Sequence, residues 1–156
     1  ALSNVHKILI NSALVSAQNR NRYYWTSFAV EQPKDKGILL KDVLESEVDE
    51  KYYLSEKRIA YFKRKIEKGF LSKICNDINI KSECLLSSMY KQMQGFCTIQ
   101  NNNIRAYSPL ECERLQTVKD NYTNHVSDTQ RYKMIGNAWT VDVIAHIFSY
   151  LDFPKQ

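Results

Sequence analysis

The sequence predicts a mixed α/β fold in which a short strand-rich segment and a final helix flank a small α+β region. Aliphatic, β-branched and aromatic residues dominate segments 7–16 and 22–28, as is typical of strands. Residues 55–68 and 141–151 instead repeat apolar residues at helical spacing. The chain has 156 residues, of which 44% are hydrophobic, so it suits one domain or a small domain with part of another.

A polar stretch, residues 17–21, separates the two predicted strands and leads into a pair of arginines. Side chains alternate along an extended chain, so Gln18, Arg20 and Arg22 are expected on one face. Their amide and guanidinium donors suit a phosphate or the edge of a nucleobase. A solvated strand edge or loop with incidental charges accounts for the same residues, and both interpretations stay open from this segment alone.

The middle of the chain predicts a short helical turn over 39–44 and a helix over 55–68. Ser55 suits the N-cap of this helix, and Gly69 suits its end. Its apolar face, at positions i, i+3 and i+7, consists of Ile59, Phe62 and Ile66. After the helix, short apolar runs at 84–86 and 96–99 suggest irregular strands, and Asn101–Asn103 suggests a turn.

Three further helices are expected towards the C-terminus. The first begins at Ser108 as N-cap, with Pro109 in its first position and Glu111 closing a capping box. The second runs from Ser127–Asp128 to Ile135 and is expected to stop at Gly136. The third, residues 141–151, has a broad apolar stripe and must pack against another element. That stripe consists of Val143, Ile144, Ile147, Phe148 and Leu151.

The net charge of +5 is unevenly distributed. Residues 42–50 carry five acidic groups and no basic group, whereas residues 51–73 carry eight basic groups against two acidic ones. A basic block beside aromatic residues is what contact with a DNA backbone requires, and a solvated helix face is the alternative. The basic residues expected to contact DNA here are Lys57, Arg58, Lys63, Arg64 and Lys65.

Several classes of protein are disfavoured by the composition. No apolar run approaches the roughly 20 residues of a membrane span, and no signal peptide is visible. The four cysteines are irregularly spaced without a Cys-x-x-Cys pair, and the three histidines are scattered, so no metal site is expected. Free thiols indicate a reducing compartment, and we therefore expect a cytoplasmic protein with no membrane partner.

Three blocks together resemble the C-terminal part of a DNA cytosine-5 methyltransferase of bacterial or phage type. Gln18-x-Arg20-x-Arg22 resembles the eighth motif of that family, and residues 105–116 resemble the ninth. Gly136-Asn137-Ala138-Trp139-Thr140-Val141 resembles the tenth. Residues 37–45 also resemble the stretch that follows the eighth motif in many bacterial and phage members. The order of the blocks, and a spacer long enough for a recognition region, strengthen the resemblance.

The resemblance implies a partial Rossmann-like methyltransferase sheet, formed by edge strands and the final helix, plus a small mixed α+β target-recognition domain. The implied boundaries are 1–28 for the last catalytic strands, 29–104 for target recognition, 105–136 for the helical ninth-motif segment, and 137–156 for the tenth motif and final helix. The implied partner is double-stranded DNA.

The resemblance also implies roles for individual residues. Arg22 would stabilise charge on the target cytosine, and Arg20 and Gln18 would hold the geometry of the active site. Residues at the expected start of the last helix would line the methionine end of S-adenosyl-L-methionine; these are Asn137, Ala138 and Trp139. In the target-recognition region, the residues expected to contact DNA are Ser87, Ser88 and Lys91, with Arg105 added from the ninth motif.

The family's catalytic dipeptides are missing from the sequence. No Pro-Cys pair, which carries the nucleophile, and no Glu-Asn pair, which holds the flipped base, occurs. With four glycines in all, a glycine-rich cofactor loop is absent too. We therefore expect a C-terminal piece that is inactive without an N-terminal catalytic half. The alternative is a non-catalytic DNA-binding or regulatory module related to the recognition domain.

Overall fold

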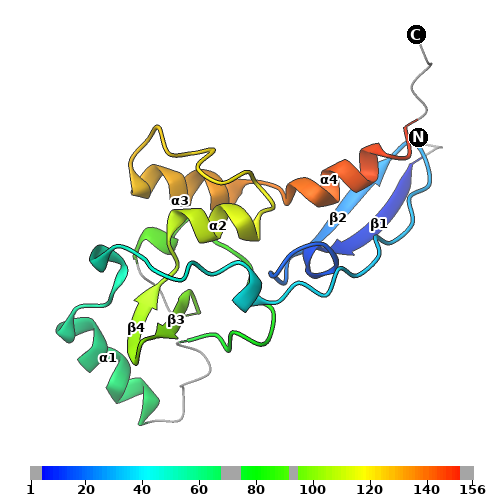
Figure 1. Ribbon diagram of the computed structural model, residues 1–156. Coiled ribbons are helices and arrows are strands. Elements are labelled where there is room, and N and C mark those ends of the chain that lie inside the picture. Colours follow the sequence, from blue (N-terminus) through cyan, green and yellow to red (C-terminus); the bar gives the residue numbers. More distant parts are fainter. Residues whose placement is uncertain (1–4, 68–74, 92–94, 152–156) are drawn as a thin grey trace.

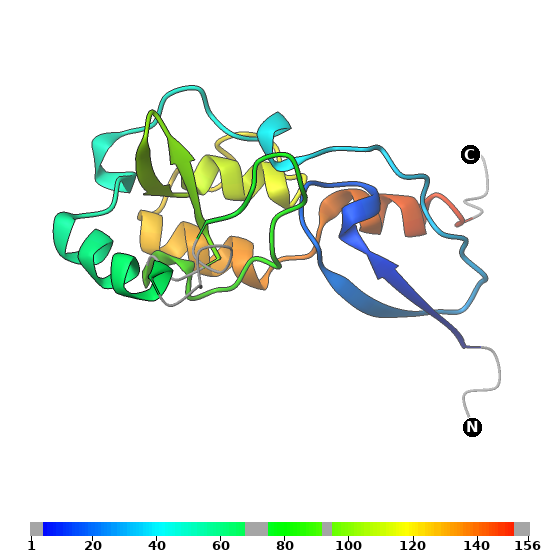
Figure 2. The same ribbon diagram turned by 90° about the horizontal axis from the view of Figure 1, so that it is seen from below.

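The computed structural model describes residues 5–67, 75–91 and 95–151, and it has two parts (Figures 1 and 2). The hairpin part comprises β1 (His6–Asn11), β2 (Asn21–Thr26) and α4 (Val141–Phe148). The larger part comprises α1 (Glu56–Ile66), β3 (Cys97–Gln100), β4 (Asn103–Ala106), α2 (Pro109–Leu115) and α3 (Asp128–Asn137). A short link between α3 and α4 joins the two parts (Figure 1).

β1 and β2 form an antiparallel pair, but β1 is shorter than the predicted strand 7–16. A 3-10 turn, η1 (Ser12–Leu14), follows it. The side-chain oxygen of Asn11 accepts hydrogen bonds from the backbone N–H groups of Ala13 and Arg20. Because this local hydrogen bonding competes with the strand ladder, the prediction is wrong beyond Asn11.

The final helix covers one face of the β1–β2 pair. Four buried residues form the shared core: Ile10, Val15, Val143 and Ile147. Ile8 and Tyr24, opposite each other across the pair, extend this apolar face. The prediction that the last helix packs against another element is therefore confirmed, and that element is the β1–β2 pair. The helix ends at Phe148, which is 55% exposed, rather than at residue 151.

The core of the larger part is built around α2 and α3. Its buried residues include Leu40, Leu85, Cys112, Leu115 and Ile135. The turn predicted over 39–44 is observed as η2 (Leu40–Asp42). A second 3-10 turn, η3 (Glu50–Tyr52), precedes α1, and a third, η5 (Met89–Lys91), packs on α3. In a smaller cluster, Phe62 of α1 is 1% exposed and packs with Leu54 and Cys97.

Local signals in the sequence predicted the turn of the second hairpin and the start of α2. Asn101 and Asn102 have positive φ angles of 51° and 62° between β3 and β4, as a two-residue hairpin turn requires. At the start of α2, Ser108 and Glu111 form the predicted capping box, and Pro109 occupies the first turn. The helix predicted from residue 55 is also confirmed, although Gly69 lies outside the described residues.

Gly136 lies inside α3, which corrects the prediction that it ends the helix. It is buried, and a Cβ atom built on it would collide with main-chain atoms of Leu86 and Ser87. Glycine is therefore required for the close approach of this segment to α3. The run 84–86, predicted as an irregular strand, instead crosses the helix as a loop.

We predict that Gly136→Ala destabilises the protein by about 1–3 kcal/mol, because the added methyl group must displace the backbone at residues 86–87. In an ordinary helix the same substitution would stabilise the protein, because alanine is favoured over glycine by roughly 1 kcal/mol. Urea unfolding measures the change. Met134→Ala, at an exposed position of the same helix, is the control and should stay within about 0.5 kcal/mol. A stabilised Gly136→Ala protein would contradict the close approach.

Candidate functional site

Gln18 and Arg20 connect the hairpin part to the larger part through buried hydrogen bonds. Arg20 donates to the carbonyl oxygens of Leu85, Gly136 and Ala138 at 3.0, 3.3 and 2.9 Å. The last two acceptors belong to the C-terminus of α3, where the helix dipole favours a cation. Arg20 is 6% exposed, so its guanidinium group faces protein rather than solvent.

A chain of buried polar side chains continues from Gln18. Its amide nitrogen donates to the carbonyl oxygen of Leu115 at 2.7 Å and to the side-chain oxygen of Gln116 at 2.9 Å. The hydroxyl of Thr140 also donates to that Gln116 oxygen and is hydrogen-bonded to the hydroxyl of Ser12 at 2.8 Å. Segments far apart in sequence therefore meet in one satisfied network. Sequence reasoning missed Gln116 and Thr140, because nothing local marks them as partners of residue 18.

Arg22 is the one member of the Gln-x-Arg-x-Arg motif whose side chain is exposed. Its guanidinium group donates to the carbonyl oxygen of Asn21 at 2.8 Å and contacts the sulfur of Cys84 at 3.7 Å. Arg20 contacts the same sulfur at 3.2 Å. The motif's side chains therefore do converge, but the expectation that three donors face a ligand is wrong, since Gln18 and Arg20 are engaged inside the protein.

Arg22 lies at a groove between the outer edge of β2 and α4, which we call the β2–α4 groove. It has a volume of about 470 Å³, within the 300–1,000 Å³ that is usual for ligand pockets. Residues from both faces of β2 line it, so the groove follows the strand edge. Its principal lining residues are Arg22, Tyr23, Trp25, Asn137, Trp139, Ile144 and Phe148. Trp25 and Trp139 are 63% and 66% exposed, which makes this surface strongly aromatic.

The strand edge along this groove has no partner in the described ranges, where β2 pairs with β1 alone. On the inner face, burial raises the pKa of Tyr24, against the opposing effect of the nearby guanidinium groups of Arg20 and Arg22. The two arginines therefore place positive charge at one end of an apolar groove.

Asn137 is the last residue of α3, and Ala138 and Trp139 lie in the link between α3 and α4, so none of the three is at the start of the last helix as expected. Asn137 and Trp139 line the β2–α4 groove. Ala138 has no polar group to offer, because its N–H donates to Ile135 and its carbonyl oxygen accepts from Arg20 and Gln116. The prediction that its backbone contacts a ligand is therefore wrong.

The start of α4 also has fewer donors for an anion than expected. The N–H of Val141 donates to the carbonyl oxygen of Gln116 at 2.9 Å, and that of Asp142 donates to the hydroxyl of Thr117 at 2.8 Å. These donors are used to attach α4 to the end of α2. This region therefore presents the side chains of Asn137 and Trp139 to the groove, rather than the N-terminus of α4.

The residues predicted to contact DNA are placed unevenly. Lys57 and Arg64 of α1 are exposed, whereas the side chains of Lys63 and Lys65 lie outside the described set. Arg58 is turned inwards: it donates to the carbonyl oxygen of Lys91 at 2.7 Å and lies over the ring of Phe62. The part-buried Ser87 and Ser88 precede η5, and Lys91 in η5 is exposed.

Comparison with known proteins identifies the family. The family model for C-5 cytosine-specific DNA methylase matches residues 4–152. The chain belongs to this family.

It spans less than half the length of two curated relatives that it matches. It is 32% identical over 145 residues to the type II methyltransferase M1.ScrFI of Lactococcus lactis subsp. cremoris, covering 81% of the chain and 37% of that protein. It is 33% identical over 144 residues to M.NlaX of Neisseria lactamica, covering 83% and 46%.

Solved structures confirm the mixed α/β methyltransferase fold. The chain aligns with the Dnmt2 methyltransferase of S. pombe with a TM-score of 0.71 at 16% identity, covering 94% of this chain and 56% of that one. It aligns with the methyltransferase EhMeth of Entamoeba histolytica with a TM-score of 0.70 at 21% identity, covering 94% and 52%. The fold class predicted from the sequence is therefore correct.

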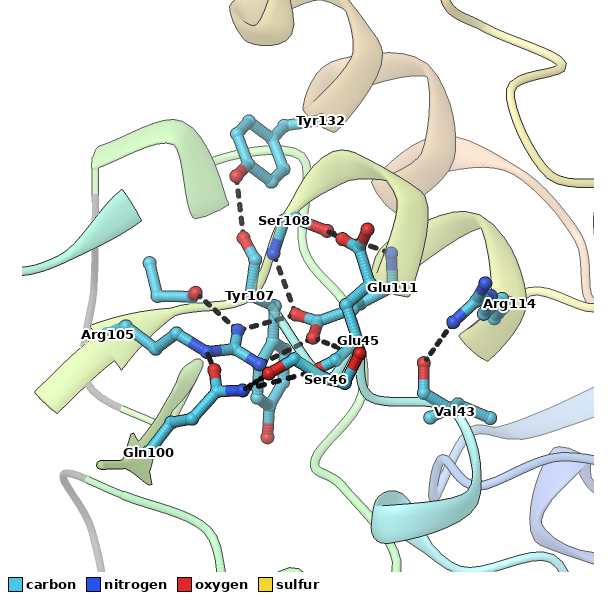
Figure 3. Close-up of polar contacts among 11 residues, drawn as sticks. Val43, Glu45, Ser46, Gln100, Arg105, Tyr107, Ser108, Glu111, Arg114 and Tyr132 are labelled. Atoms are coloured by element: carbon cyan, nitrogen blue, oxygen red, sulfur yellow. Dashed lines mark hydrogen bonds and ion pairs between the residues drawn. The ribbon is translucent and has the colours of Figure 1, made fainter. Parts of the chain in front are cut away.

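Arg105, expected to contact DNA, is fully buried in this methylase chain, so that prediction is wrong (Figure 3). Its guanidinium group forms a two-point ion pair with Glu111, at 2.6 and 2.8 Å, and also bonds Gln100. Glu111 additionally accepts from the backbone N–H groups of Ser108 and Glu45. The pair thus joins β4, the start of α2 and the loop before η3, which is a structural role.

A second buried carboxylate, Glu113, organises the loop between α2 and α3. It accepts from the N–H groups of Asn121 and Thr123, from the Thr123 hydroxyl, and from Arg131 at 3.1 Å. Sequence reasoning gave no role to this residue, since a glutamate on a helix is ordinarily solvated. Its burial shows that α2 carries two carboxylates that fix the surrounding backbone.

The buried thiols are unsuited to nucleophilic chemistry. Burial raises the pKa of Cys97 to about 12, and burial together with the nearby carboxylates raises the pKa of Cys112 well above its usual value. Within the described ranges, no group of three or more His, Cys, Asp or Glu side chains is arranged to hold a metal ion. No helix of the described chain has the length and apolar character needed to cross a bilayer.

We predict that Glu111→Gln costs about 3–5 kcal/mol of stability, because it leaves the Arg105 charge buried without its counter-ion. Asp120→Asn is the matched control, since it breaks the partly exposed ion pair with Arg114. That change should cost less than about 1 kcal/mol. Chemical unfolding of both variants measures the difference, and equal losses would show that burial does not distinguish the pairs.

Proposed function

We propose that this chain is the C-terminal portion of a DNA (cytosine-5-)-methyltransferase that transfers a methyl group from S-adenosyl-L-methionine to cytosine in duplex DNA. An N-terminal catalytic part supplies the Pro-Cys nucleophile and the Glu-Asn pair, which the sequence lacks. The observation that carries the proposal is the contrast within the Gln-x-Arg-x-Arg motif. Gln18 and Arg20 are fixed in the interior, and Arg22 is left exposed at the β2–α4 groove.

The chemistry of the target explains why an arginine is suited to this position. A cytosine inside a duplex must leave the base stack before its carbon 5 can react. Negative charge then develops on the ring, and a permanent cation directed at the ring carbonyl oxygen stabilises it. Arg22 supplies that cation. Arg20 and Gln18 are positioning residues, because their bonds to α3 and to Leu115 fix the start of β2 from which Arg22 projects.

The residues lining the groove fit one end of S-adenosyl-L-methionine. Trp139 offers an exposed indole face, which attracts cations such as a sulfonium or ammonium group, and Asn137 offers an amide. When bound, this cofactor supplies the activated methyl group. The chain's own residues would wall the site on one side, and the N-terminal part completes it.

The β2–α4 groove is where the N-terminal part joins. An unpaired strand edge is a template for pairing with another strand, and here it is flanked by exposed aromatic side chains. The coverage of the relatives agrees, because the chain accounts for 37% of one and 46% of the other. In this assembly β2 becomes an inner strand of a larger sheet, and the free edge disappears.

We predict that the purified 156-residue chain transfers no methyl group to DNA. It lacks the nucleophile and most of the cofactor site, each of which is worth orders of magnitude in rate. Incorporation of tritiated methyl groups into duplex DNA measures this. Adding a methyltransferase N-terminal part that bears Pro-Cys and Glu-Asn should produce activity, and transfer by the chain alone would overturn the proposal.

In the reconstituted enzyme, we predict that Arg22→Ala lowers the methyl-transfer rate by on the order of 10²–10³, with little loss of DNA affinity. The charge that Arg22 stabilises develops only in the transition state, so binding should be nearly unchanged. Single-turnover rates and DNA Kd values separate the two effects. Arg22→Lys, which keeps the charge but loses the planar fork, should recover part of the rate.

Lys119→Ala is the control for this measurement, because it removes an exposed positive charge from the loop after α2, which does not line the β2–α4 groove. Rate and affinity should both stay close to those of the unaltered enzyme. Equal losses of rate and affinity in Arg22→Ala would make Arg22 a phosphate contact. No loss of either would remove it from the site.

A further inference from the structure

Tyr90 in η5 lies between the ammonium groups of two lysines from different elements. The Nζ atom of Lys91 is 5.7 Å from the ring centroid, and the Nζ atom of Lys133 on α3 is 5.5 Å from it. All three residues are exposed. In the described ranges, neither ammonium group lies within ion-pair distance of a carboxylate. Two positive charges therefore gather around one ring without an acidic neighbour to neutralise them.

The attraction of an aromatic face for cations holds these ammonium groups near each other. Their mutual repulsion opposes the arrangement, and an anion bound beside them removes that cost. Phosphate groups of a nucleic-acid backbone are anions of this kind, and lysine binds them as a point charge. The cluster is thus better suited to a bound phosphate than to isolated solvated lysines.

Contacts within the fold fix the elements beneath the cluster. Arg58 of α1 donates to the carbonyl oxygen of Lys91 at 2.7 Å, which ties the end of η5 to α1. On the other side, Gly136 lets residues 86–87 approach α3 closely, just before η5. Lys91 and Lys133 are therefore carried by elements that are packed together, and the spacing of their charges is set by the fold.

The cluster lies one helical turn from the β2–α4 groove. Lys133 and Asn137 are four residues apart on the exposed face of α3, a rise of about 6 Å along the helix. Asn137 lines the groove with Arg22. The lysines are thus on the same side of α3 as a residue that lines the groove beside Arg22.

We propose that Lys91 and Lys133, held by Tyr90, bind backbone phosphates of duplex DNA next to the groove that would hold the target cytosine. The placement relative to the target rests on the proposed function, whereas the phosphate binding itself rests on the cluster. Lys133 belongs to the helix that leads into the tenth motif. The same surface of α3 therefore carries Lys133, which contacts DNA, and Asn137, which lines the groove.

The salt dependence of DNA binding tests this proposal. We measure the affinity of the full chain for a random-sequence duplex by fluorescence anisotropy at several salt concentrations, because phosphate contacts are independent of sequence. Lys91→Gln with Lys133→Gln should reduce the slope of log affinity against log salt by about 1 for each lysine. The matched control is Lys41→Gln with Lys119→Gln, which removes the same charge at two other exposed positions. An equal change of slope in both double variants, or no change in the first, would overturn the proposal.

Variants of Tyr90 distinguish the contribution of its ring, which positions the two lysines, from the contribution of the lysine charges. Tyr90→Leu keeps both lysines but removes the ring, and should weaken binding several-fold, while Tyr90→Phe should bind as the unaltered chain does. Thermal unfolding of each variant should be unchanged, since the residues are exposed. Tyr90→Leu binding with unaltered affinity would exclude the ring from the site.

The proposed function can fail separately. A reconstituted enzyme that methylates DNA while the lysine variants keep their salt slope would overturn the phosphate site alone. A reconstituted enzyme that is inactive while the lysine variants lose slope would overturn the proposed function and leave the phosphate site in place.

Discussion

The arrangement of the two parts depends on the hydrogen bonds of the buried Arg20 guanidinium group. Within the described residues its acceptors are the carbonyl oxygens of Leu85, Gly136 and Ala138 and the sulfur of Cys84, with no carboxylate among them. A charge removed from water needs compensation, and the partial negative charge at the C-terminus of α3 provides it. Any rotation of the hairpin part against α3 would strip the cation of these acceptors, so the relative position of the parts is tightly specified.

The exposure of Arg22 follows from that constraint. Arg20 and Gln18 commit the start of β2 to the interior, and the strand then runs outwards along α4. Arg22 therefore projects from a fixed base into the β2–α4 groove. The same geometry leaves the outer edge of β2 open, so the exposed position of Arg22 and the unpaired strand edge are products of one arrangement.

Helix α2 fixes the backbone around it in the larger part through two buried carboxylates. The Arg105–Glu111 pair and the Glu113–Arg131 pair use charged groups to fix loops that would otherwise have unpaired backbone donors. Loss of one partner from such a pair strongly destabilises the protein, because the remaining charge is left buried without its counter-ion. The Glu113–Arg131 pair ties the loop after α2 to α3, the helix that also carries Lys133.

By itself, the sequence determined the features that depend on neighbouring residues: the fold class, the capping box at Ser108, the asparagine turn and the apolar stripe of α4. These follow from local hydrogen bonding and side-chain periodicity. Only the tertiary structure decided which charged and polar groups are buried. Arg105 and Arg20 look as available as Arg22 in the sequence, and Gly136 looks like a helix end. The roles of Arg20 and Gly136 depend on segments dozens of residues away. Arg105 pairs with the nearby Glu111, but the pair is buried by the packed chain around it. Desolvation and close backbone approach are properties of the packed chain, which the sequence alone does not display.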